Sequence, residues 1–282
     1  MLNIAERKET LERKVLHRTK GHQHGPVTRL VSPGDLGELI KPFVFLDMFN
    51  MDASRENLFG YHPHSGIVTV TVIIEGNVKY EDSTGKAGLL TAGTVEWMQA
   101  GGGVWHTADP VPQVGTRLRG FQLWLALPAA IENAEPESLY IEPHEIPKTG
   151  PARVIIGEYQ GVSSPLPKIA SITYLHVSLA DGEQWTFDPP ANHDVLWIAL
   201  NEGSVRVSGE QLSNEIAIFD SKSTSLTIEA QGSVSFVLGS AERHPHPLIT
   251  GSYSVHTTED ALRIGEEGIK KVGKRLKAEG RI

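Results

Sequence analysis

Short apolar runs, separated by turns that contain glycine or proline, recur along most of the chain. The run 67–75 (IVTVTVIIE) is rich in β-branched residues and is followed by a turn at Glu75-Gly76-Asn77. Such residues favour strands. Further strands are predicted at VEWMQA, at VWH, which follows a glycine triplet, and at GFQLWLALP (120–128). Short strands with regular turn spacing are typical of an antiparallel sandwich or barrel, so we predict an all-β fold.

The second half of the chain resembles the first. Residues 129–152 carry several prolines and little periodicity, and are predicted to form a bridge, after which strand patterns resume with RVIIG and SITYLHVSL. The segment IIEGNVKY in the first half is matched by ALNEGSVRV in the second, with Glu202-Gly203 over Glu75-Gly76. This match suggests a duplication. We expect one domain over 1–135, a second over 136–256 and a C-terminal helix over 257–282.

The helical expectation for the tail rests on periodicity. Leu262, Ile269, Val272 and Leu276 fall on one face of a helix, and Thr257 or Thr258 can cap its start. The segment 270–281, KKVGKRLKAEGR, is strongly basic. Charge runs of this kind usually form the solvated face of a helix, while contact with an acidic partner or nucleic acid is the alternative.

Composition narrows the chemistry. The chain has 282 residues, a net charge of −8 and no cysteine, which leaves His, Asp and Glu as possible metal ligands. The negative charge argues against direct nucleic-acid binding, which needs clustered Lys and Arg. The first 15 residues lack the apolar core of a signal peptide and no apolar stretch is long enough to span a membrane. We therefore expect a cytoplasmic protein.

Three histidine pairs stand out among the 12 histidines: His22/His24, His62/His64 and His244/His246. Residues i and i+2 of a strand point to the same face, so His-x-His can present two imidazoles to one ion. His62-Pro63-His64 directly precedes a clear strand, and His106 ends another strand 42 residues after His64. The other two pairs lie in polar or proline-flanked stretches and are predicted to be loops.

Histidines 62, 64 and 106 are therefore the candidate metal ligands. Three neutral imidazoles suit a divalent ion such as iron, nickel, copper, zinc or manganese better than magnesium or calcium. A site with three protein ligands also keeps open positions, as catalytic sites require. The alternative is that these histidines are surface or hydrogen-bonded residues without a metal.

The residues around these histidines carry a family resemblance. The run Tyr61-His-Pro-His-Ser-Gly-Ile-Val-Thr-Val-Thr, with Glu96-Trp97-Met98, Ala100-Gly101 and Val104-Trp105-His106, resembles the signature of the pirin family, as do Pro42-Phe43, Leu46-Asp47 and Gln122-Leu123-Trp124. The resemblance is specific over about residues 14–130 and weaker beyond. It implies a bicupin of the cupin superfamily: two antiparallel β-barrels, of which the N-terminal one binds a metal, usually iron. Some members are reported as quercetin 2,3-dioxygenases, and the human member as a nuclear transcription cofactor.

The carboxylates of the family pattern are missing. The resemblance implies four ligands, namely the histidines corresponding to His62, His64 and His106, and a glutamate two residues after the last. That position is Ala108 here, and Val68 stands where members often carry another glutamate. Asp109 could substitute only if a bulge turned it inward, because on a regular strand it faces away from the cavity. The expected site is thus a three-histidine variant with more positive charge, which would favour anionic ligands.

The second half is predicted to be metal-free. The offset of 127 residues between Glu75 and Glu202 places Pro189, Ala191 and Ser233 over the three histidines, and His193 lies nearby but out of register. None of the three aligned residues can replace an imidazole.

Two functional hypotheses follow. In the first, the chain is a metal-dependent dioxygenase of the quercetinase type acting on a flat aromatic or enol substrate. Trp97, Trp105, Trp124 and Phe121 could line its pocket, although buried core is the commoner role for such residues. In the second, it is a metal-binding regulatory or interaction protein without turnover, with a protein partner for the basic tail.

Overall fold

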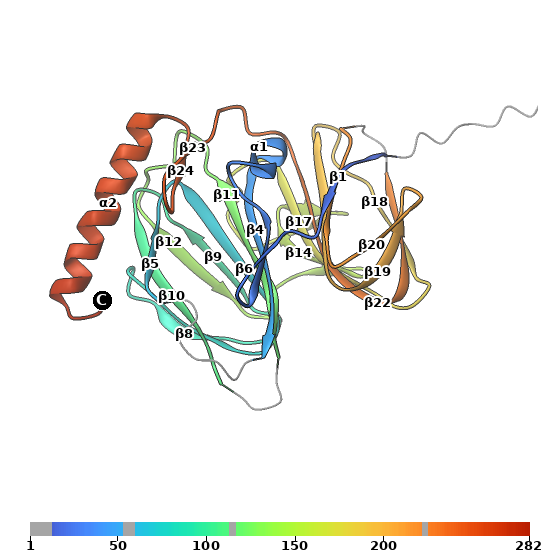
Figure 1. The fold of residues 1–282 in the computed structure, drawn as a ribbon, viewed down its shortest axis with the longest axis horizontal. Coiled ribbons are helices and arrows are strands. Elements are labelled where there is room, and N and C mark those ends of the chain that lie inside the picture. The colour runs from blue at the N-terminus through green and yellow to red at the C-terminus, as the bar shows by residue number, and fades with distance from the viewer. Residues whose placement is uncertain (1–12, 53–59, 113–116, 222–224) are drawn as a thin grey trace, which may run out of the picture.

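The computed structural model describes residues 13–52, 60–112, 117–221 and 225–282. It is built from antiparallel sheets and two helices, α1 (Leu36–Ile40) and α2 (Glu259–Ala278). The predicted fold class, all-β with two antiparallel units and a C-terminal helix, is confirmed. Figure 1 shows the two units side by side, with α2 at the outer end of the first. No helix among the described residues is both long and apolar enough to cross a membrane.

The first unit contains two sheets. The larger has the order β12-β9-β6-β11-β4-β3-β2 and the smaller the order β5-β10-β7-β8. Their strands are β2 (His22–His24), β3 (Val27–Val31), β4 (Phe43–Asp52), β5 (His62–His64), β6 (Ile67–Glu75), β7 (Val78–Asp82), β8 (Ala87–Leu90), β9 (Val95–Gln99), β10 (Val104–Pro110), β11 (Arg117–Ala126) and β12 (Glu137–Ile141).

The second unit has one extended sheet of order β1-β21-β19-β22-β17-β14-β13, with β18 paired to β22 and β20 to β19. Its strands are β1 (Val15–Thr19), β13 (Lys148–Thr149), β14 (Ala152–Ile156), β17 (Ile172–Leu179), β18 (Gln184–Phe187), β19 (Val195–Val207), β20 (Glu210–Ser213), β21 (Ile216–Phe219) and β22 (Leu226–Ala241). Two small hairpins complete the chain: β15 (Glu158–Tyr159) with β16 (Val162–Ser163), and β23 (Ile249–Thr250) with β24 (Val255–His256).

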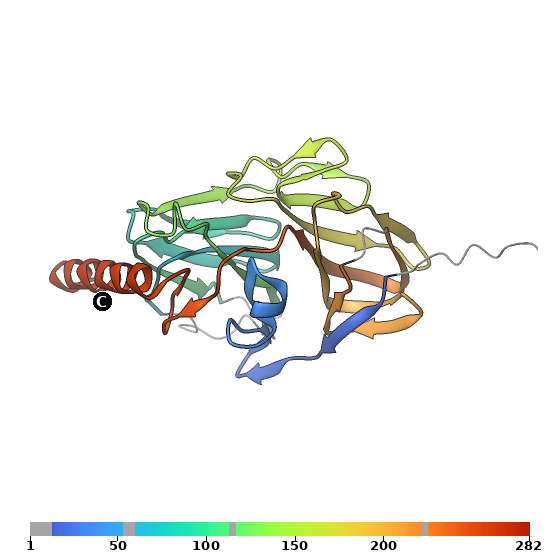
Figure 2. The same cartoon turned by 90° about the horizontal axis from the view of Figure 1, so that it is seen from above.

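The two units pack through a shared apolar core. Alternation along β6 directs Val68, Val70 and Val72 into this core, where they join residues of β17, β19 and β21 from the second unit. Phe43 meets Trp197 edge to face, with ring centroids 5.2 Å apart. Figure 2 shows the sheets of the two units stacked against each other when the molecule is seen from above. Burial of this continuous apolar surface holds the units together.

The intervening residues of β6 face the interior of the first unit. There, residues from both of its sheets form two apolar clusters, one around Phe49, Ile73 and Leu118 and another around Ile67, Met98 and Val104. Polar side chains on the same face of the strands, including Thr69 and Thr71, are buried as well. The histidines described below lie in this interior.

Two sequence expectations differ from the structure. The segment 129–152 is not irregular throughout, because β12 lies within it and pairs with β9 in the first unit. The N-terminal strand β1 pairs with β21 of the second unit. The chain therefore contributes a strand to the second unit before it enters the first. Both differences arise from pairings between distant segments, which local periodicity does not reveal.

Candidate metal centre

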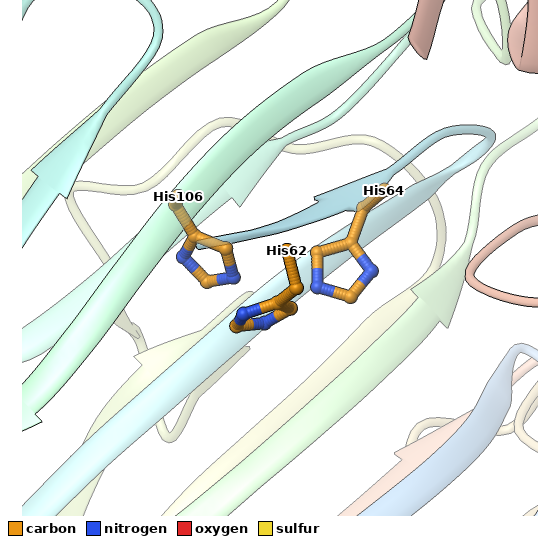
Figure 3. A group of neighbouring side chains, drawn as sticks. All are labelled: His62, His64 and His106. Atoms are coloured by element: carbon orange, nitrogen blue, oxygen red, sulfur yellow. The ribbon is translucent and has the colours of Figure 1, made fainter. Parts of the chain in front are cut away.

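His62, His64 and His106 lie together in the interior of the first unit. His62 and His64 alternate with Pro63 on β5, and the β5–β10 pairing sets His62 opposite His106. The three side chains therefore share one face of a two-stranded ribbon. Each can offer one ring nitrogen such that the three atoms lie within 4.8 Å of one another, and Figure 3 shows the rings of His64 and His106 turned toward His62.

In His62 and His64, one ring nitrogen faces a backbone carbonyl and the other is left free to bind a metal. Nδ1 of His62 lies 2.8 Å from the carbonyl oxygen of Gly60, and Nδ1 of His64 lies 3.2 Å from that of Tyr253. Because a carbonyl only accepts, both Nδ1 atoms carry the proton and both Nε2 atoms present a lone pair. Nε2 of His64 and both ring nitrogens of His106 are buried without a hydrogen-bond partner. Such orphaned nitrogens are what a metal site without its ion presents.

The electrostatics also suit a metal. Burial, helped by the neighbouring His106, lowers the pKa of His62 to about 4. The same two causes, together with His62, lower the pKa of His64 well below its ordinary value. Both rings are therefore neutral at physiological pH, the state that binds cations. The donor set fits a single divalent transition-metal ion.

Neither of the two positions at which the family pattern has a carboxylate provides a metal-binding side chain in this chain. Ala108 points inward two residues after His106, and Asp109 points to the opposite face, where its Oδ2 accepts a hydrogen bond of 3.1 Å from Thr107. The β7–β10 pairing runs from His106 to Pro110 without a bulge, so nothing turns Asp109 inward. Val68 lies in the apolar core between the units, and valine offers no ligand atom.

A carboxylate from another strand does reach the site. Glu96 of β9 is 1% exposed, and its Oε1 lies 3.5 Å from Nδ1 of His106. The sequence analysis missed this residue and described the site as lacking a carboxylate. The available signal was an acidic residue inside the apolar run VEWM, because a glutamate buried in a strand needs a polar partner.

A small cavity borders His62. It is lined by His62, Thr71 and Ala108 and by apolar side chains that include Phe49 and Leu118, and its volume is about 40 Å³. The alanine at 108 thus widens the space beside His62. Asp47 and Gln122 add polar groups to the wall, the former bound to Arg29 by hydrogen bonds of 3.0 Å.

The four aromatic residues named as pocket candidates do not line this cavity. Trp97 and Phe121 belong to the core between the units. Trp105 donates a hydrogen bond of 2.9 Å to the carbonyl of Ile269 in α2. Trp124 stacks on Phe45 and meets His64 edge to face, with centroids 4.8 Å apart. Trp124 therefore packs against the ring of the candidate ligand His64 and restricts its orientation.

The other histidine pairs form no comparable group among the described residues. His22 and His24 are exposed on β2, a short strand where a loop was expected. His244 and His246 lie outside the strands as expected, and Nε2 of His244 is 3.2 Å from the carbonyl of Leu127. His193 is held between Ser171 and Ser240.

The corresponding place in the second unit is filled by apolar residues. In the second unit, β22 takes the place of β10, because it pairs with β18 and with the end of β19 as β10 pairs with β5 and β7. In this register Phe187 lies opposite Leu226, just as His62 lies opposite His106 in the first unit. Both side chains are buried in the core of the second unit. The fixed offset that placed Ser233 over His106 does not follow this register, because Leu226 is the residue of β22 opposite Phe187 and Ser233 lies farther along the same strand.

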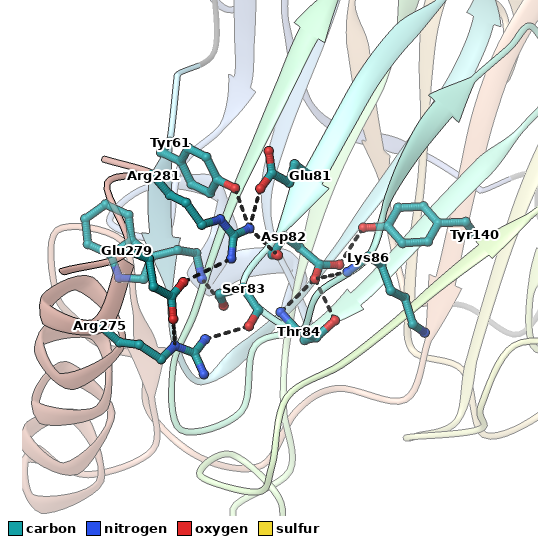
Figure 4. A network of polar contacts seen from close by, with 11 residues as sticks. Tyr61, Glu81, Asp82, Ser83, Thr84, Lys86, Tyr140, Arg275, Glu279 and Arg281 are labelled. Carbon is teal, nitrogen blue, oxygen red and sulfur yellow. Dashed lines mark hydrogen bonds and ion pairs between the residues drawn. The ribbon is translucent and has the colours of Figure 1, made fainter. Parts of the chain in front are cut away.

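The C-terminal segment encloses the centre. Besides the Tyr253 carbonyl on His64, Ser65 donates a hydrogen bond of 2.8 Å to Ser254 and lies 3.0 Å from Nε2 of His256. Nδ1 of His256 is in turn 3.4 Å from buried Glu132. Figure 4 shows the end of α2 joined to the edge of the first unit by polar contacts. Its lysines 270, 271, 274 and 277 remain exposed, as expected for a solvated face.

Comparisons with known proteins point to one family. The family model described as Pirin matches residues 26–125. A pirin-like protein of Caulobacter vibrioides is 32% identical over 72% of this chain and 76% of its own length. A Pseudomonas aeruginosa protein named as a candidate quercetin 2,3-dioxygenase is 32% identical over 93% of this chain and 100% of its own length. The crystal structure of quercetin 2,3-dioxygenase from Acinetobacter baumannii superposes with a TM-score of 0.83 at 25% identity, covering 92% of this chain and 97% of that one.

Proposed function

We propose that this chain, which belongs to the pirin family, binds one iron ion through Nε2 of His62, His64 and His106 and acts as a dioxygenase of the quercetinase type. The observation that carries the proposal is the convergence of three imidazoles, among which Nε2 of His64 and both ring nitrogens of His106 are buried without a hydrogen-bond partner. Its relatives named for quercetin 2,3-dioxygenase support the choice of reaction.

The site's own residues suit a flat aromatic substrate that carries an enol. The apolar wall formed by Val27, Phe49, Ile73 and Leu118 would hold the rings and exclude water. The small side chain of Ala108 leaves room for a substrate oxygen beside His62. A bound redox-active ion supplies electron transfer between substrate and dioxygen. The protein's part is to place the substrate edge against the histidines and to keep the rings of His62 and His64 neutral.

The remaining parts of the proposal follow from sequence and charge. We place the protein in the cytoplasm. We also expect no direct binding of nucleic acid, because the net charge of the chain is −8. Nickel, copper, zinc and manganese are the alternatives to iron. A protein partner without turnover is the rival hypothesis, and the experiment below separates the two.

The test is metal analysis followed by an oxygen assay. Purified protein should contain about one equivalent of metal per chain, and His62→Ala and His106→Ala should each lose it. His246→Ala, which changes an exposed histidine outside the cluster, is the matched control and should keep it. The iron-, nickel-, copper-, zinc- and manganese-loaded proteins are then mixed with quercetin under oxygen. Substrate loss no faster than with free metal in every form would reject the dioxygenase and favour the rival.

A further inference from the structure

We propose that Glu96 is a positioning residue of the metal centre, which holds His106 through its Nδ1 and supplies the negative charge that no ligand side chain provides. The inference rests on the proposed function, since it concerns the same site. It assigns Glu96 an outer role: the carboxylate binds the ligand His106 and does not take a coordination position itself.

The carboxylate is fixed from its far side. Thr71 on β6 lies opposite Glu96 on β9, and its hydroxyl donates a hydrogen bond of 2.6 Å to Oε2. This bond directs the other oxygen, Oε1, toward His106, 3.5 Å from Nδ1. Oε1 has no hydrogen-bond partner and is buried. A carboxylate oxygen left in this state is costly, and a donated proton from His106 removes that cost.

The pairing decides which nitrogen of His106 faces the other histidines. With the proton on Nδ1 and directed to Oε1, Nε2 carries the lone pair. His62 and His64 follow the same arrangement, with Nδ1 directed to the carbonyls of Gly60 and Tyr253. With this pairing, each of the three ligands would have an outer partner at Nδ1, which fixes the ring orientation. Among these partners, only that of His106, the carboxylate of Glu96, is charged.

The charge matters because an imidazole ligand brings no negative charge to the ion. A divalent ion held by three imidazoles has a total charge of +2, and Glu96 behind His106 brings the charge of the buried assembly to +1. In the pattern implied by the family resemblance, a coordinated carboxylate at position 108 would do the same. Moving the carboxylate from that place to Glu96 keeps the charge balance but leaves the position beside Ala108, on the wall of the cavity, open to a ligand.

This placement makes a prediction about ligand class. The cavity beside His62 and Ala108 is lined mainly by apolar side chains and the ion would have no coordinated carboxylate, so the centre would favour a compact anionic donor such as a phenolate or enolate oxygen. Glu96 would also increase the electron density that His106 donates, because a hydrogen bond to a carboxylate makes an imidazole more basic.

The test compares Glu96→Gln with the full-length wild type, using Co²⁺ as a spectroscopic probe. The variant preserves the shape of the side chain but removes its charge. We expect Co²⁺ affinity, measured by competition with a chromophoric chelator, to fall about 10- to 100-fold, with a shift of the visible absorption bands of bound Co²⁺. Thr71→Val, which removes only the bond that orients the carboxylate, should give a smaller loss in the same direction.

The matched control is Glu137→Gln. It makes the same chemical change at an exposed position of β12, the strand paired with β9, and should leave affinity and spectrum unchanged. If Glu96→Gln and wild type bind Co²⁺ equally tightly with identical spectra, Glu96 is only structural and the inference fails. X-ray absorption that shows a carboxylate bound to Co²⁺ in wild type and lost in Glu96→Gln would also overturn the outer role. A wild-type chain that binds neither Co²⁺ nor iron would instead overturn the proposed function itself.

Discussion

The guanidinium of Arg281, next to the C-terminus, donates a hydrogen bond of 2.8 Å to the hydroxyl of Tyr61, the residue directly before His62. The same group bonds Glu81 and the carbonyl of Asp82 on β7, as Figure 4 shows. Burial and the nearby Glu81 raise the pKa of Tyr61 to about 12, so the hydroxyl stays protonated. The last residues of the chain thereby hold the strand that carries two candidate ligands.

The first prediction concerns this contact. Arg281→Ala should lower the free energy of unfolding by about 1 kcal/mol, because charge-assisted hydrogen bonds stabilise but this one is partly exposed to solvent. Amide hydrogens in the last turns of α2 should exchange faster. Lys277→Ala, which changes an exposed residue of the same helix, serves as the control. Equal exchange in both variants would show that Arg281 does not hold the helix end.

The second prediction uses the glycines of α2. A Cβ added at Gly268 would lie 1.7 Å from the carbonyl oxygen of Gly102, whereas one at Gly273 would meet the Trp105 ring at 3.0 Å. Alanine raises helix propensity by about 1 kcal/mol at either position, but only Gly268 abuts backbone. Gly268→Ala should therefore destabilise the protein by about 2 kcal/mol, and Gly273→Ala should change stability by less than about 1 kcal/mol. Urea titrations of both variants give the comparison, and equal effects would contradict it.

The histidine trio could be predicted because its signal is local. Alternation along a strand puts His62 and His64 on one face, and His106 was selected because it ends a second strand that could pair with the first; the family resemblance pointed to the same three residues. Glu96 could not be predicted from spacing. Its approach to His106 requires β9 and β10 to fall in the two facing sheets of the first unit, and such pairings between distant strands follow from topology instead of from sequence distance.

The second unit shows the same limit. Glu75 and Glu202, aligned as duplicated positions, both bind Arg119, at 2.7 and 2.5 Å, which agrees with equivalent hairpins meeting at the contact between the units. Beyond that hairpin the fixed offset fails. The single strand β22 performs the roles that β10 and β11 divide between them in the first unit, so the spacing between equivalent residues changes.

The third prediction tests whether the second unit lacks a metal. Phe187 is fully buried at the place that corresponds to His62. Phe187→Ala should reduce the free energy of unfolding by about 3–5 kcal/mol through cavity formation, yet leave the metal content of the folded protein unchanged. Metal analysis and urea titration of the same preparation check both parts. Loss of metal in the folded variant would indicate that the second unit contributes to binding.

The fourth prediction concerns stability below neutral pH. His176 on β17 is buried, with Nε2 2.9 Å from the Ser235 hydroxyl. Burial, aided by the positive charges of Arg153 and Arg119, lowers its pKa to about 4. The unfolded chain, in which the pKa is near 6.5, binds the proton first. The folded state is therefore favoured fully above pH 6.5 and loses stability as the pH falls toward 4. At pH 5 this one residue should account for a loss of about 2 kcal/mol.

The variant His176→Gln isolates that contribution, because glutamine can still bond Ser235 and does not titrate. Its free energy of unfolding should fall less than that of wild type between pH 7.5 and pH 5, by about 2 kcal/mol. Urea titrations at the two pH values give the difference directly. His22→Gln, which makes the same substitution at an exposed position of β2, is the matched control for the chemical change itself. Parallel pH dependences for wild type and His176→Gln would mean that His176 accepts a proton in the folded protein as readily as in the unfolded chain.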